Sequence, residues 1–299
     1  MSENTFKSGF VSIIGMPNVG KSTLLNSILG QKVSIVSDKP QTTRNRILGV
    51  KTLPGTQVIF IDTPGIHKPK HKLNQFMVKT AINTLDEVDI VLFMTEAGES
   101  IGAGDRYIIE ILKKTKKPVF LLINKIDMVQ KGTLLPLMDE FSRLCKFEEI
   151  FPVSALHGDN IAELEESIMR RLPEGPQYFP EDAVTDQPMR FIAAELVREK
   201  IFQLTYEEIP YSVAVGIEEF REDDEKKVAF IRAVIFVDKV SQKGIIIGKG
   251  GTMLKKVGQL AREELEAIMG VKVFLELWVK VKSGWRGDDM ILRMLGYKV

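Results

Sequence analysis

Eight residues near the start of the chain, Gly15-Met16-Pro17-Asn18-Val19-Gly20-Lys21-Ser22, have the spacing of a phosphate-binding loop. The apolar run 10–14 precedes them, and the helix-like run 21–29 follows. A loop with two glycines can wrap its backbone N–H groups around phosphate oxygens, and a helix N-terminus adds positive potential. We therefore expect a strand, a phosphate loop and a helix, in which Lys21 reaches the β- and γ-phosphates and Ser22 can ligate Mg²⁺.

Short apolar runs alternate with longer amphipathic stretches as far as residue 172. The expected strands are 10–14, 58–61, 90–94, 119–123 and 150–153, and the expected helices are 21–29, 74–85, 105–114, 134–144 and 161–171. Unbroken apolar strands separated by helices predict an α/β domain with a mostly parallel sheet that is buried on both faces. Such sheets bind their ligands at the strand ends.

A different pattern begins after a stretch rich in proline. The stretch 173–188 contains Pro173, Pro176, Pro180 and Pro188 and is typical of a linker. Beyond it we expect a helix, two strands, a glycine turn, a helix, a strand and a tail helix, at 190–204, 211–220, 228–237, 248–251, 252–269, 271–281 and 288–295. The sequence therefore predicts an α/β domain over 1–172, a linker over 173–188 and a smaller α+β domain over 189–299.

The composition excludes several classes of protein. With 44% hydrophobic and 27% charged residues, the chain is neither disordered nor collagen-like. One cysteine, Cys145, can form neither an internal disulfide nor a thiolate zinc site, which fits a reducing compartment. The first residues contain no apolar signal core, and no apolar run approaches the roughly 18 residues of a membrane span. We expect a cytoplasmic monomer.

A second cluster of polar residues follows the expected strand 58–61. Asp62-Thr63-Pro64-Gly65 places a carboxylate at a strand end, where it can hold Mg²⁺ through a water molecule. The Gly65 N–H can donate to the γ-phosphate. An aspartate at a strand end is by itself often only a turn residue, but together with the phosphate loop it predicts the metal site.

Two further strand ends predict the choice of base. Asn124, Lys125 and Asp127 follow the strand 119–123, and Ser154 with Ala155 follows the strand 150–153. The Asp127 carboxylate can accept from guanine N1–H and from its 2-amino group, a pair that adenine lacks; leaving it unpaired can cost roughly 10⁴-fold in selectivity. Lys125 can lie along the base and tie this loop to the phosphate loop, and a backbone N–H near Ala155 can donate to guanine O6.

With these motifs in this order, residues 1–172 resemble the translation-factor-like GTPases. The resemblance implies a threonine that closes over Mg²⁺ and the γ-phosphate, which is Thr43 in Gln41-Thr42-Thr43-Arg44, with Thr42 as the alternative. The position after Gly65, where Ras-like members carry a water-orienting glutamine, is Ile66, so we expect slow basal hydrolysis. Several such GTPases use K⁺ held by an asparagine that matches Asn18; the alternative is that Asn18 simply braces the loop.

The predicted site is therefore a single set of residues at the strand ends. The expected nucleotide-binding residues are Gly15, Met16, Pro17, Asn18, Val19, Gly20, Lys21, Ser22, Thr23, Asp62, Thr63, Pro64, Gly65, Ile66, Asn124, Lys125, Asp127, Ser154 and Ala155. The expected metal ligands are Ser22, Thr43 and Asp62, and the expected catalytic residues are Lys21, Thr43, Gly65 and Asn18. The cofactors are GTP or GDP and Mg²⁺, with K⁺ as a further candidate.

The second domain contains a G-x-x-G turn in a basic region. Residues 181–225 carry 4 basic and 13 acidic side chains, whereas residues 226–299 carry 15 basic and 7 acidic ones, so the net charge of +1 hides a basic C-terminal part. The turn resembles that of a type II KH module, which clamps about four nucleotides of single-stranded RNA. The expected RNA-binding residues are Ile246, Ile247, Gly248, Lys249, Gly250, Gly251, Lys255, Lys256 and Arg262, with the two isoleucines beneath the bases.

A GTPase domain followed by a KH module resembles the Era family of bacterial GTPases over essentially the whole chain. The resemblance implies a GTPase, stimulated by K⁺, RNA or the ribosome, that binds 16S rRNA near its 3′ end and assists assembly of the small ribosomal subunit. Peripheral association with the inner face of the membrane is also known for the family, although no strongly amphipathic basic helix here explains it. The rival interpretations are an RNA scaffold with structural GTP, and an RNA-modifying GTPase, which the absence of a modification-type nucleophile disfavours.

Overall fold

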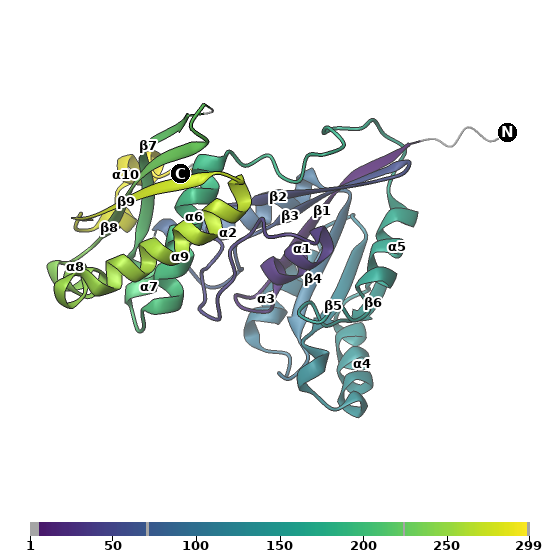
Figure 1. Ribbon diagram of the computed structural model, residues 1–299. Coiled ribbons are helices and arrows are strands. Elements are labelled where there is room, and N and C mark those ends of the chain that lie inside the picture. The colour runs from purple at the N-terminus through teal and green to yellow at the C-terminus, as the bar shows by residue number, and fades with distance from the viewer. Residues whose placement is uncertain (1–5, 70–71, 224, 298–299) are drawn as a thin grey trace. The chain divides into compact units, whose positions relative to one another are not determined.

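The first half of the chain folds around a six-stranded sheet, seen in a computed structural model that describes residues 6–69, 72–223 and 225–297 (Figure 1). The strand order is β2-β3-β1-β4-β5-β6. The strands are β1 (Lys7–Gly15), β2 (Ile47–Leu53), β3 (Thr56–Asp62), β4 (Ile90–Glu96), β5 (Val119–Asn124) and β6 (Glu149–Pro152). Every neighbouring pair is parallel except β2 with β3, which confirms the mostly parallel sheet.

Helices cover both faces of this sheet. They are α1 (Lys21–Leu29), α2 (Lys72–Glu87), α3 (Ala103–Leu112), α4 (Leu134–Leu144) and α5 (Ile161–Arg171). Apolar residues of α2, α3 and α4 form one core cluster with Ile14, Phe93 and Ile123 of the sheet. On the other face α5 lies over β2 and β3, where Ile168 and Phe60 line one small cavity. Because both faces are buried, every ligand-binding loop emerges at the strand ends.

Strand β2 is absent from the sequence prediction. It pairs antiparallel with β3 through a tight turn at Pro54-Gly55, in which Gly55 has a left-handed φ of 73°. Its sequence, Ile-Leu-Gly-Val-Lys-Thr-Leu, combines a central glycine with weak alternation, so only the turn residues indicate a hairpin. The hairpin pairs Ile47, at the start of β2, with Asp62, at the end of β3.

Most of the stretch predicted as a linker is a strap (residues 173–185) bound to the first half of the chain. The Gln57 amide holds it in the middle, because Gln57 Oε1 accepts from the backbone N–H groups of Tyr178 and Phe179 at 2.8 and 3.0 Å. Further along, Val50 N–H donates to the Val184 carbonyl at 2.8 Å. The stretch predicted as a linker is therefore not free over these residues, because it has hydrogen-bond partners on β2 and β3.

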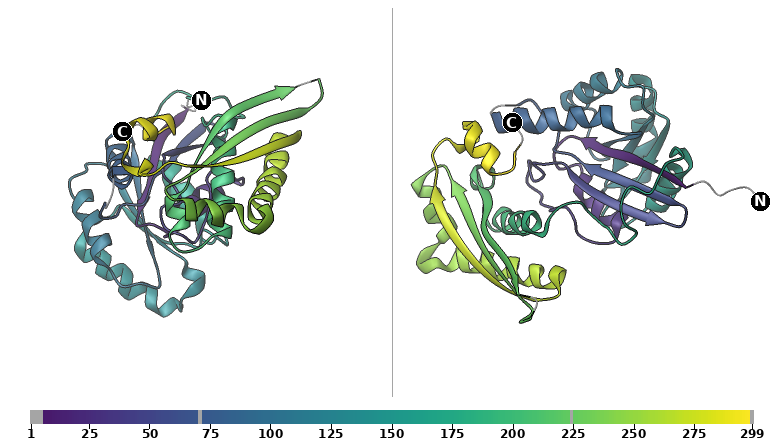
Figure 2. Two further views of the ribbon diagram at one scale, coloured as in Figure 1. Left: turned by 90° about the vertical axis from the view of Figure 1, so that its left-hand side faces the viewer. Right: turned by 90° about the horizontal axis from the view of Figure 1, so that it is seen from above.

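The second half of the chain builds a three-stranded sheet in the order β7-β8-β9 (Figure 2). Its strands are β7 (Ala214–Asp223), β8 (Val228–Val237) and β9 (Lys272–Val281), and its helices are α6 (Met189–Leu204), α7 (Ile209–Ser212), α8 (Val240–Ile247), α9 (Thr252–Met269) and α10 (Asp289–Met294). Strands β7 and β8 are antiparallel, and β8 and β9 are parallel. Apolar residues of α6, α8 and α9 pack on this sheet in one cluster.

Helix α8 corrects the sequence prediction, which assigned no helix before the glycine turn. Three consecutive isoleucines, Ile245 to Ile247, favour a strand by propensity. Two features outweigh it: the Gln242 side chain accepts from the Asp238 and Lys239 N–H groups at 2.9 and 3.0 Å, and Ile246 is fully buried. The helix start is thus capped and its end is anchored in the core.

By packing, the chain divides into two units, with the boundary in sequence between residues 186 and 187. Two short segments of the first half group with the second unit: the loop 37–42 and the first turn of α2. None of the helices in the described part of the chain combines the length and the apolar character that crossing a bilayer needs.

Candidate functional site

The phosphate loop joins β1 to α1 by a turn that only glycine can make. Gly20 has a left-handed φ of 102°, and a Cβ there would lie 2.2 Å from Asn124 Nδ2. Asn124 uses this close approach to donate to the Val19 carbonyl at 2.8 Å. Helix α1 then begins at Lys21, so its first N–H groups face the loop. The loop therefore leads into the N-terminus of α1, where the first backbone N–H groups have no partner within the helix.

Lys21 is buried beside two backbone carbonyls and the Asp62 carboxylate. Its ammonium donates to the Met16 carbonyl at 2.8 Å and to the Gly15 carbonyl at 3.4 Å. Burial lowers the pKa of Lys21 to about 8, although the Asp62 carboxylate opposes the shift. A buried cation of this kind is stabilised by added negative charge, which a phosphate would supply.

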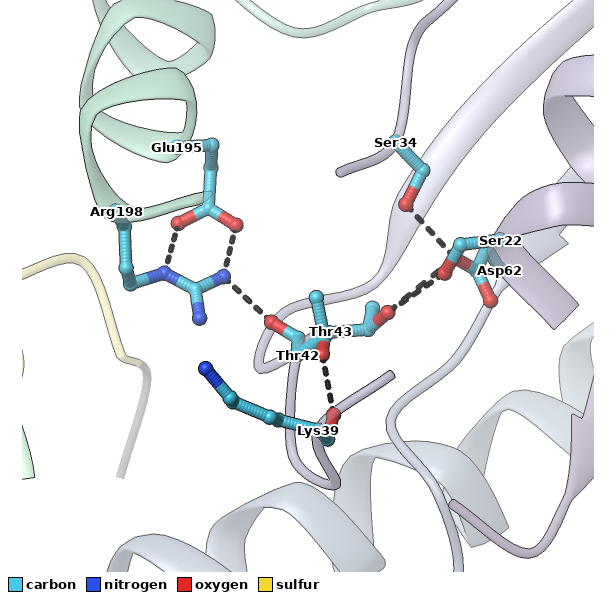
Figure 3. A network of polar contacts seen from close by, with 8 residues as sticks. All are labelled: Ser22, Ser34, Lys39, Thr42, Thr43, Asp62, Glu195 and Arg198. Atoms are coloured by element: carbon cyan, nitrogen blue, oxygen red, sulfur yellow. Dashed lines mark hydrogen bonds and ion pairs between the residues drawn. The ribbon is translucent and has the colours of Figure 1, made fainter. Parts of the chain in front are cut away.

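The predicted metal ligands Ser22 and Thr43 both donate hydrogen bonds to the carboxylate of Asp62, the third predicted ligand. Its Oδ2 accepts from Ser22 at 2.6 Å, from Ser34 at 2.9 Å and from Thr43 at 3.5 Å (Figure 3). Burial raises the pKa of the Asp62 carboxyl, and the Lys21 ammonium and the three hydroxyl donors oppose that rise. Ser34 has no place in the sequence prediction, because it lies in a loop without a recognisable motif.

The second oxygen of this carboxylate supports a cation site. Asp62 Oδ1 is buried and has no hydrogen-bond partner among the described residues. A buried acceptor of this kind is normally satisfied, and a bound cation would satisfy it. Carboxylate and hydroxyl oxygens are the ligands that Mg²⁺ prefers, together with substrate phosphates. Ser22, Thr43 and Asp62 therefore fit Mg²⁺.

The two candidate threonines differ in direction. The Thr43 hydroxyl lies 2.9 Å from Ser22 Oγ, whereas the Thr42 hydroxyl donates to the Lys39 carbonyl at 2.6 Å, away from the metal ligands (Figure 3). Both residues are buried. The geometry favours Thr43 as the ligand, because its hydroxyl already lies beside Ser22 and Asp62.

The segment after Asp62 touches the phosphate loop by backbone. A Cβ on Gly65 would lie 2.7 Å from Pro17 N, so only glycine fits, and the Ile66 N–H donates to the Gly15 carbonyl at 3.0 Å. Two residues of the predicted nucleotide-binding set have side chains with structural partners: Ile66 is fully buried in the core, and the Thr63 hydroxyl donates to the Ile13 carbonyl at 2.8 Å. A contact of either residue with nucleotide would therefore come from its backbone, and both stay predictions.

The predicted base-reading residues lie together at the ends of β5 and β6. Asn124 Oδ1 accepts from the Ala155 N–H at 2.9 Å, so Asn124 ties this loop to the phosphate loop through its two amide atoms. Ser154 Oγ donates to Asp127 Oδ1 at 2.6 Å, and this hydrogen bond lowers the pKa of the Asp127 carboxyl. Lys125 pairs with Glu96 at 2.6 Å, so in this structure the tie predicted for Lys125 is made by Asn124.

In the second unit a glycine turn lies between α8 and α9. Gly248, Gly250 and Gly251 have left-handed φ values of 74°, 61° and 79°. Beyond the turn a groove runs between α9 and β9, lined by Leu254, Lys255, Arg262 and Phe274 among others. Gly258 lines the groove without a side chain, and a Cβ there would lie 3.3 Å from Leu277. The turn and the groove form one continuous surface along α9.

The predicted RNA-binding side chains fall into two groups. Lys249, Lys255, Lys256 and Arg262 are exposed on the turn and on α9. Ile246 is fully buried in the core of the unit, and Ile247 packs against the same core. The prediction that Ile246 lies beneath splayed bases is wrong, because α8 turns this side chain inward. The aromatic ring available at the groove is instead Phe274, which is 61% exposed.

Comparisons with known proteins agree with both halves of the site. Residues 10–125 match the family model described as 50S ribosome-binding GTPase, and residues 208–286 match the KH domain. The chain is 48% identical to Era solved with MgGDPNP and nucleotides 1506–1542 of 16S ribosomal RNA, over 98% of this chain and 100% of that one, with a TM-score of 0.95. The same identity, coverage and TM-score hold for a variant of Aquifex aeolicus Era bound to GDP and AlF₄⁻. The chain therefore belongs to the Era family of GTPases.

Proposed function

We propose that this protein is a GTP-operated switch that binds single-stranded 16S rRNA near its 3′ end and assists assembly of the small ribosomal subunit. The observation that carries the proposal is that one chain holds both a guanine-nucleotide site and a G-x-x-G groove, and matches over 98% of its length an Era protein solved with MgGDPNP and that RNA. The two sites support a protein whose RNA affinity depends on the bound nucleotide.

The nucleotide site supports binding and orientation by this chain's own groups. The backbone donors of the phosphate loop and the Lys21 ammonium hold the β- and γ-phosphates, and Asp127 with Ser154 reads guanine. Ser22, Thr43 and Asp62 would hold Mg²⁺, which would neutralise charge on the phosphate oxygens. Gly65, which packs on Pro17, would donate its N–H to the γ-phosphate.

Hydrolysis in this site is expected to be slow without a stimulus. Ile66 is apolar and buried, so its side chain cannot orient the attacking water. Asn18, which is exposed on the phosphate loop with a left-handed φ of 67°, is the proposed holder of K⁺. GTPase rates measured in K⁺ and in Na⁺ test this role: equal rates, together with a neutral Asn18→Ala variant, would remove it.

The RNA site supports a clamp along α9. Lys249 lies in the turn, and Lys255 and Arg262 border the groove, so phosphates can follow the basic side while bases lie against Phe274. We also propose that the protein acts in the cytoplasm and associates peripherally with the inner face of the membrane. Fractionation of cells at low and high salt tests this location.

RNA binding in two nucleotide states is the central test. The probe is a single-stranded RNA with the 3′ sequence of 16S rRNA, titrated against the protein with GDP and with GDPNP. A switch should bind it about 5-fold or more tighter in one state. Equal affinities would leave an RNA scaffold with structural GTP.

A charge-matched pair of variants tests the clamp. Lys249→Ala, Lys255→Ala and Lys256→Ala together should abolish crosslinks to the RNA, keep nucleotide binding and reduce the slope of log K against log salt by about 2, at about 0.7 per phosphate contact. The control removes three exposed lysines of the first unit, Lys113, Lys114 and Lys116. RNA binding that survives the first triple change would overturn the clamp, and loss of binding in the control as well would show a general charge effect.

A further inference from the structure

The loop 37–42 leads directly to Thr43 and is held by helix α6 of the second unit, with which it groups. One contact comes from Arg198 on α6, whose Nη2 donates to the Thr42 carbonyl at 2.6 Å (Figure 3). The guanidinium is only 1% exposed. A charged donor in a buried place makes a strong hydrogen bond, and its loss leaves the acceptor unpaired.

Glu195, one turn earlier on α6, fixes the direction of this guanidinium. It accepts from Arg198 Nε at 2.8 Å and pairs with Nη2 as well, so the carboxylate holds the arginine in a bidentate fork. The Phe202 ring lies 5.2 Å from the guanidinium carbon. Because the fork and the ring define the plane of the guanidinium, the third contact, to Thr42, has a fixed place.

Lys39 makes a second attachment in the opposite direction. Its ammonium donates to the carbonyls of Phe202 and Thr205 at the C-terminal end of α6, and it lies 4.8 Å from the centre of the Tyr206 ring. The last carbonyls of a helix lack partners within the helix and carry its negative end, so a cation there is stabilised. A cation of the helix, Arg198, therefore binds the loop, and a cation of the loop, Lys39, binds the end of the helix.

The contact to Thr42 reaches the metal ligands through one peptide bond. The Thr42 carbonyl and the Thr43 nitrogen belong to the same planar unit, so holding the oxygen orients the backbone from which the Thr43 side chain starts. Gln41, just before, has a left-handed φ of 64°, a conformation that costs about 1 kcal/mol or more for a residue with a side chain. The loop needs outside support to keep it.

Helix α6 is also part of the core beneath the G-x-x-G turn. Val197 and Ile201, on the turns that flank Arg198, share one apolar cluster with Ile246 of α8 and with Val257 and Ala261 of α9. A shift of α6 would therefore be felt at the helices on both sides of the glycine turn, because close-packed cores transmit displacement. One helix thus contacts the Thr42 carbonyl and supports the RNA-binding turn.

We propose that Arg198 is the positioning residue that couples the two sites: by holding the Thr42–Thr43 peptide it sets the Thr43 hydroxyl beside Ser22 and Asp62, and it ties that arrangement to α6. The inference rests on the proposed function and adds to it the residue, the helix and the bond through which nucleotide state reaches the RNA groove. The ligands coupled in this way are the γ-phosphate with Mg²⁺ at the nucleotide site and single-stranded RNA at the groove.

The test compares four affinities of the full chain: GDP, GDPNP with Mg²⁺, and the 16S 3′ RNA in each nucleotide state. In Arg198→Met, affinity for GDPNP should fall about 10-fold or more, and affinity for GDP should stay within about 2-fold. The ratio of RNA affinities between the two states should fall toward one, because coupling is reciprocal. RNA affinity in the GDP state should not change.

Lys200→Met is the matched control, since Lys200 is a buried cation of the same helix that pairs with Glu199 at 2.8 Å and with Glu264. Equal behaviour of the two variants would show a merely structural role and overturn the inference. If Arg198→Met unfolds, the double variant Arg198→Met with Glu195→Gln removes the carboxylate that the single change leaves unpaired. Lys39→Gln tests the second attachment without burying a charge. A wild-type RNA affinity ratio of one would instead reject the proposed switch, and an undiminished ratio in these variants would reject only the role of Arg198.

Discussion

Ser154 donates a 2.6 Å hydrogen bond to Asp127, so the loop predicted to contact guanine O6 through a backbone N–H near Ala155 also fixes the carboxylate predicted to read guanine N1–H and the 2-amino group. The bond occupies Asp127 Oδ1 and lies beside a longer approach of His157 Nε2 to Oδ2, at 3.8 Å. It lowers the pKa of Asp127, so the carboxylate is ionised wherever the protein is expected to work. An ionised acceptor held in one orientation is suited to a pair of N–H donors.

Asp127→Asn should exchange guanine for xanthine. The amide offers a donor where the carboxylate offered an acceptor, and xanthine carries an oxygen where guanine carries its 2-amino group. We expect GDP affinity to fall by roughly 10⁴-fold and XDP affinity to rise, measured by titration of fluorescent nucleotides. Asp159→Asn, in the same loop region, is the control. If Asp127→Asn binds neither GDP nor XDP, the loop has collapsed. Ser154→Ala, which keeps the Asp127 carboxylate, then serves as the test, and it should still prefer guanine.

Thr43→Ala and Thr42→Ala should separate the two candidate ligands. Only the Thr43 hydroxyl lies with Ser22 and Asp62, so Thr43→Ala should reduce the Mg²⁺-dependent preference for GDPNP over GDP by about 10-fold, the cost of one hydrogen bond to a charged group. Thr42→Ala removes only the bond to the Lys39 carbonyl and should have a smaller effect. Thr43→Ser should keep the preference. A larger effect at Thr42 would reverse the assignment.

Nucleotide affinity should fall as the pH rises above about 8, the pKa to which burial lowers Lys21. Phosphate binds the charged ammonium, so binding raises that pKa and takes up a proton from solvent above pH 8, with affinity falling by up to about 10-fold per pH unit. Calorimetry in two buffers of different ionisation enthalpy measures the proton uptake. Lys21→Arg stays charged and should lose this pH dependence; the same uptake in that variant would assign it to another group.

The same shift has the opposite sign for folding without nucleotide. The folded-state pKa of Lys21 lies below the ordinary lysine value of about 10.5, so the unfolded chain binds more protons between these two values. The free energy of unfolding contributed by this group should therefore rise between about pH 8 and pH 10.5. Urea unfolding of the wild type against Lys21→Arg measures the difference.

Ile246→Ala should destabilise the second unit without a direct effect on RNA contacts. The side chain is fully buried in the core cluster, so its truncation should cost about 2–5 kcal/mol of unfolding free energy in urea. Its neighbour Ile245 is 50% exposed, and Ile245→Ala should cost less than about 1 kcal/mol. Lower RNA affinity at unchanged stability for Ile246→Ala would restore the base-contact role predicted from the sequence.

Elements bounded by strong local signals were predictable to the residue. Helix α9 runs from Thr252 to Met269 between Gly251 and Gly270, whose left-handed φ values of 79° and 68° only glycine adopts without strain. Helix α1 likewise begins after Gly20 and ends before Gly30. The nucleotide motifs were readable for the same reason: each depends on a short stretch in which glycine, lysine or aspartate has one chemical use.

Features set by distant contacts were not predictable. Ile245 to Ile247 have the propensity of a strand, and only the burial of Ile246 and the cap from Gln242 make them helical. Nothing local to Thr42 indicates that its carbonyl meets Arg198, 156 residues later. The direction of the Thr63 hydroxyl and of the Ile66 side chain likewise depends on β1 and on the core, which a motif does not contain.

The strap over residues 173–185 has a consequence for the order in which the protein is made. Until Val184 has left the ribosome, Val50 on the outer edge of β2 lacks the acceptor that it has in the finished protein, and the N–H at that edge stays open to other chains. Synthesis at about 5–20 residues per second leaves this edge uncovered for several seconds after β3 is complete. The outer edge of β2 is thus covered by a segment that the ribosome makes only after all six strands of the first sheet.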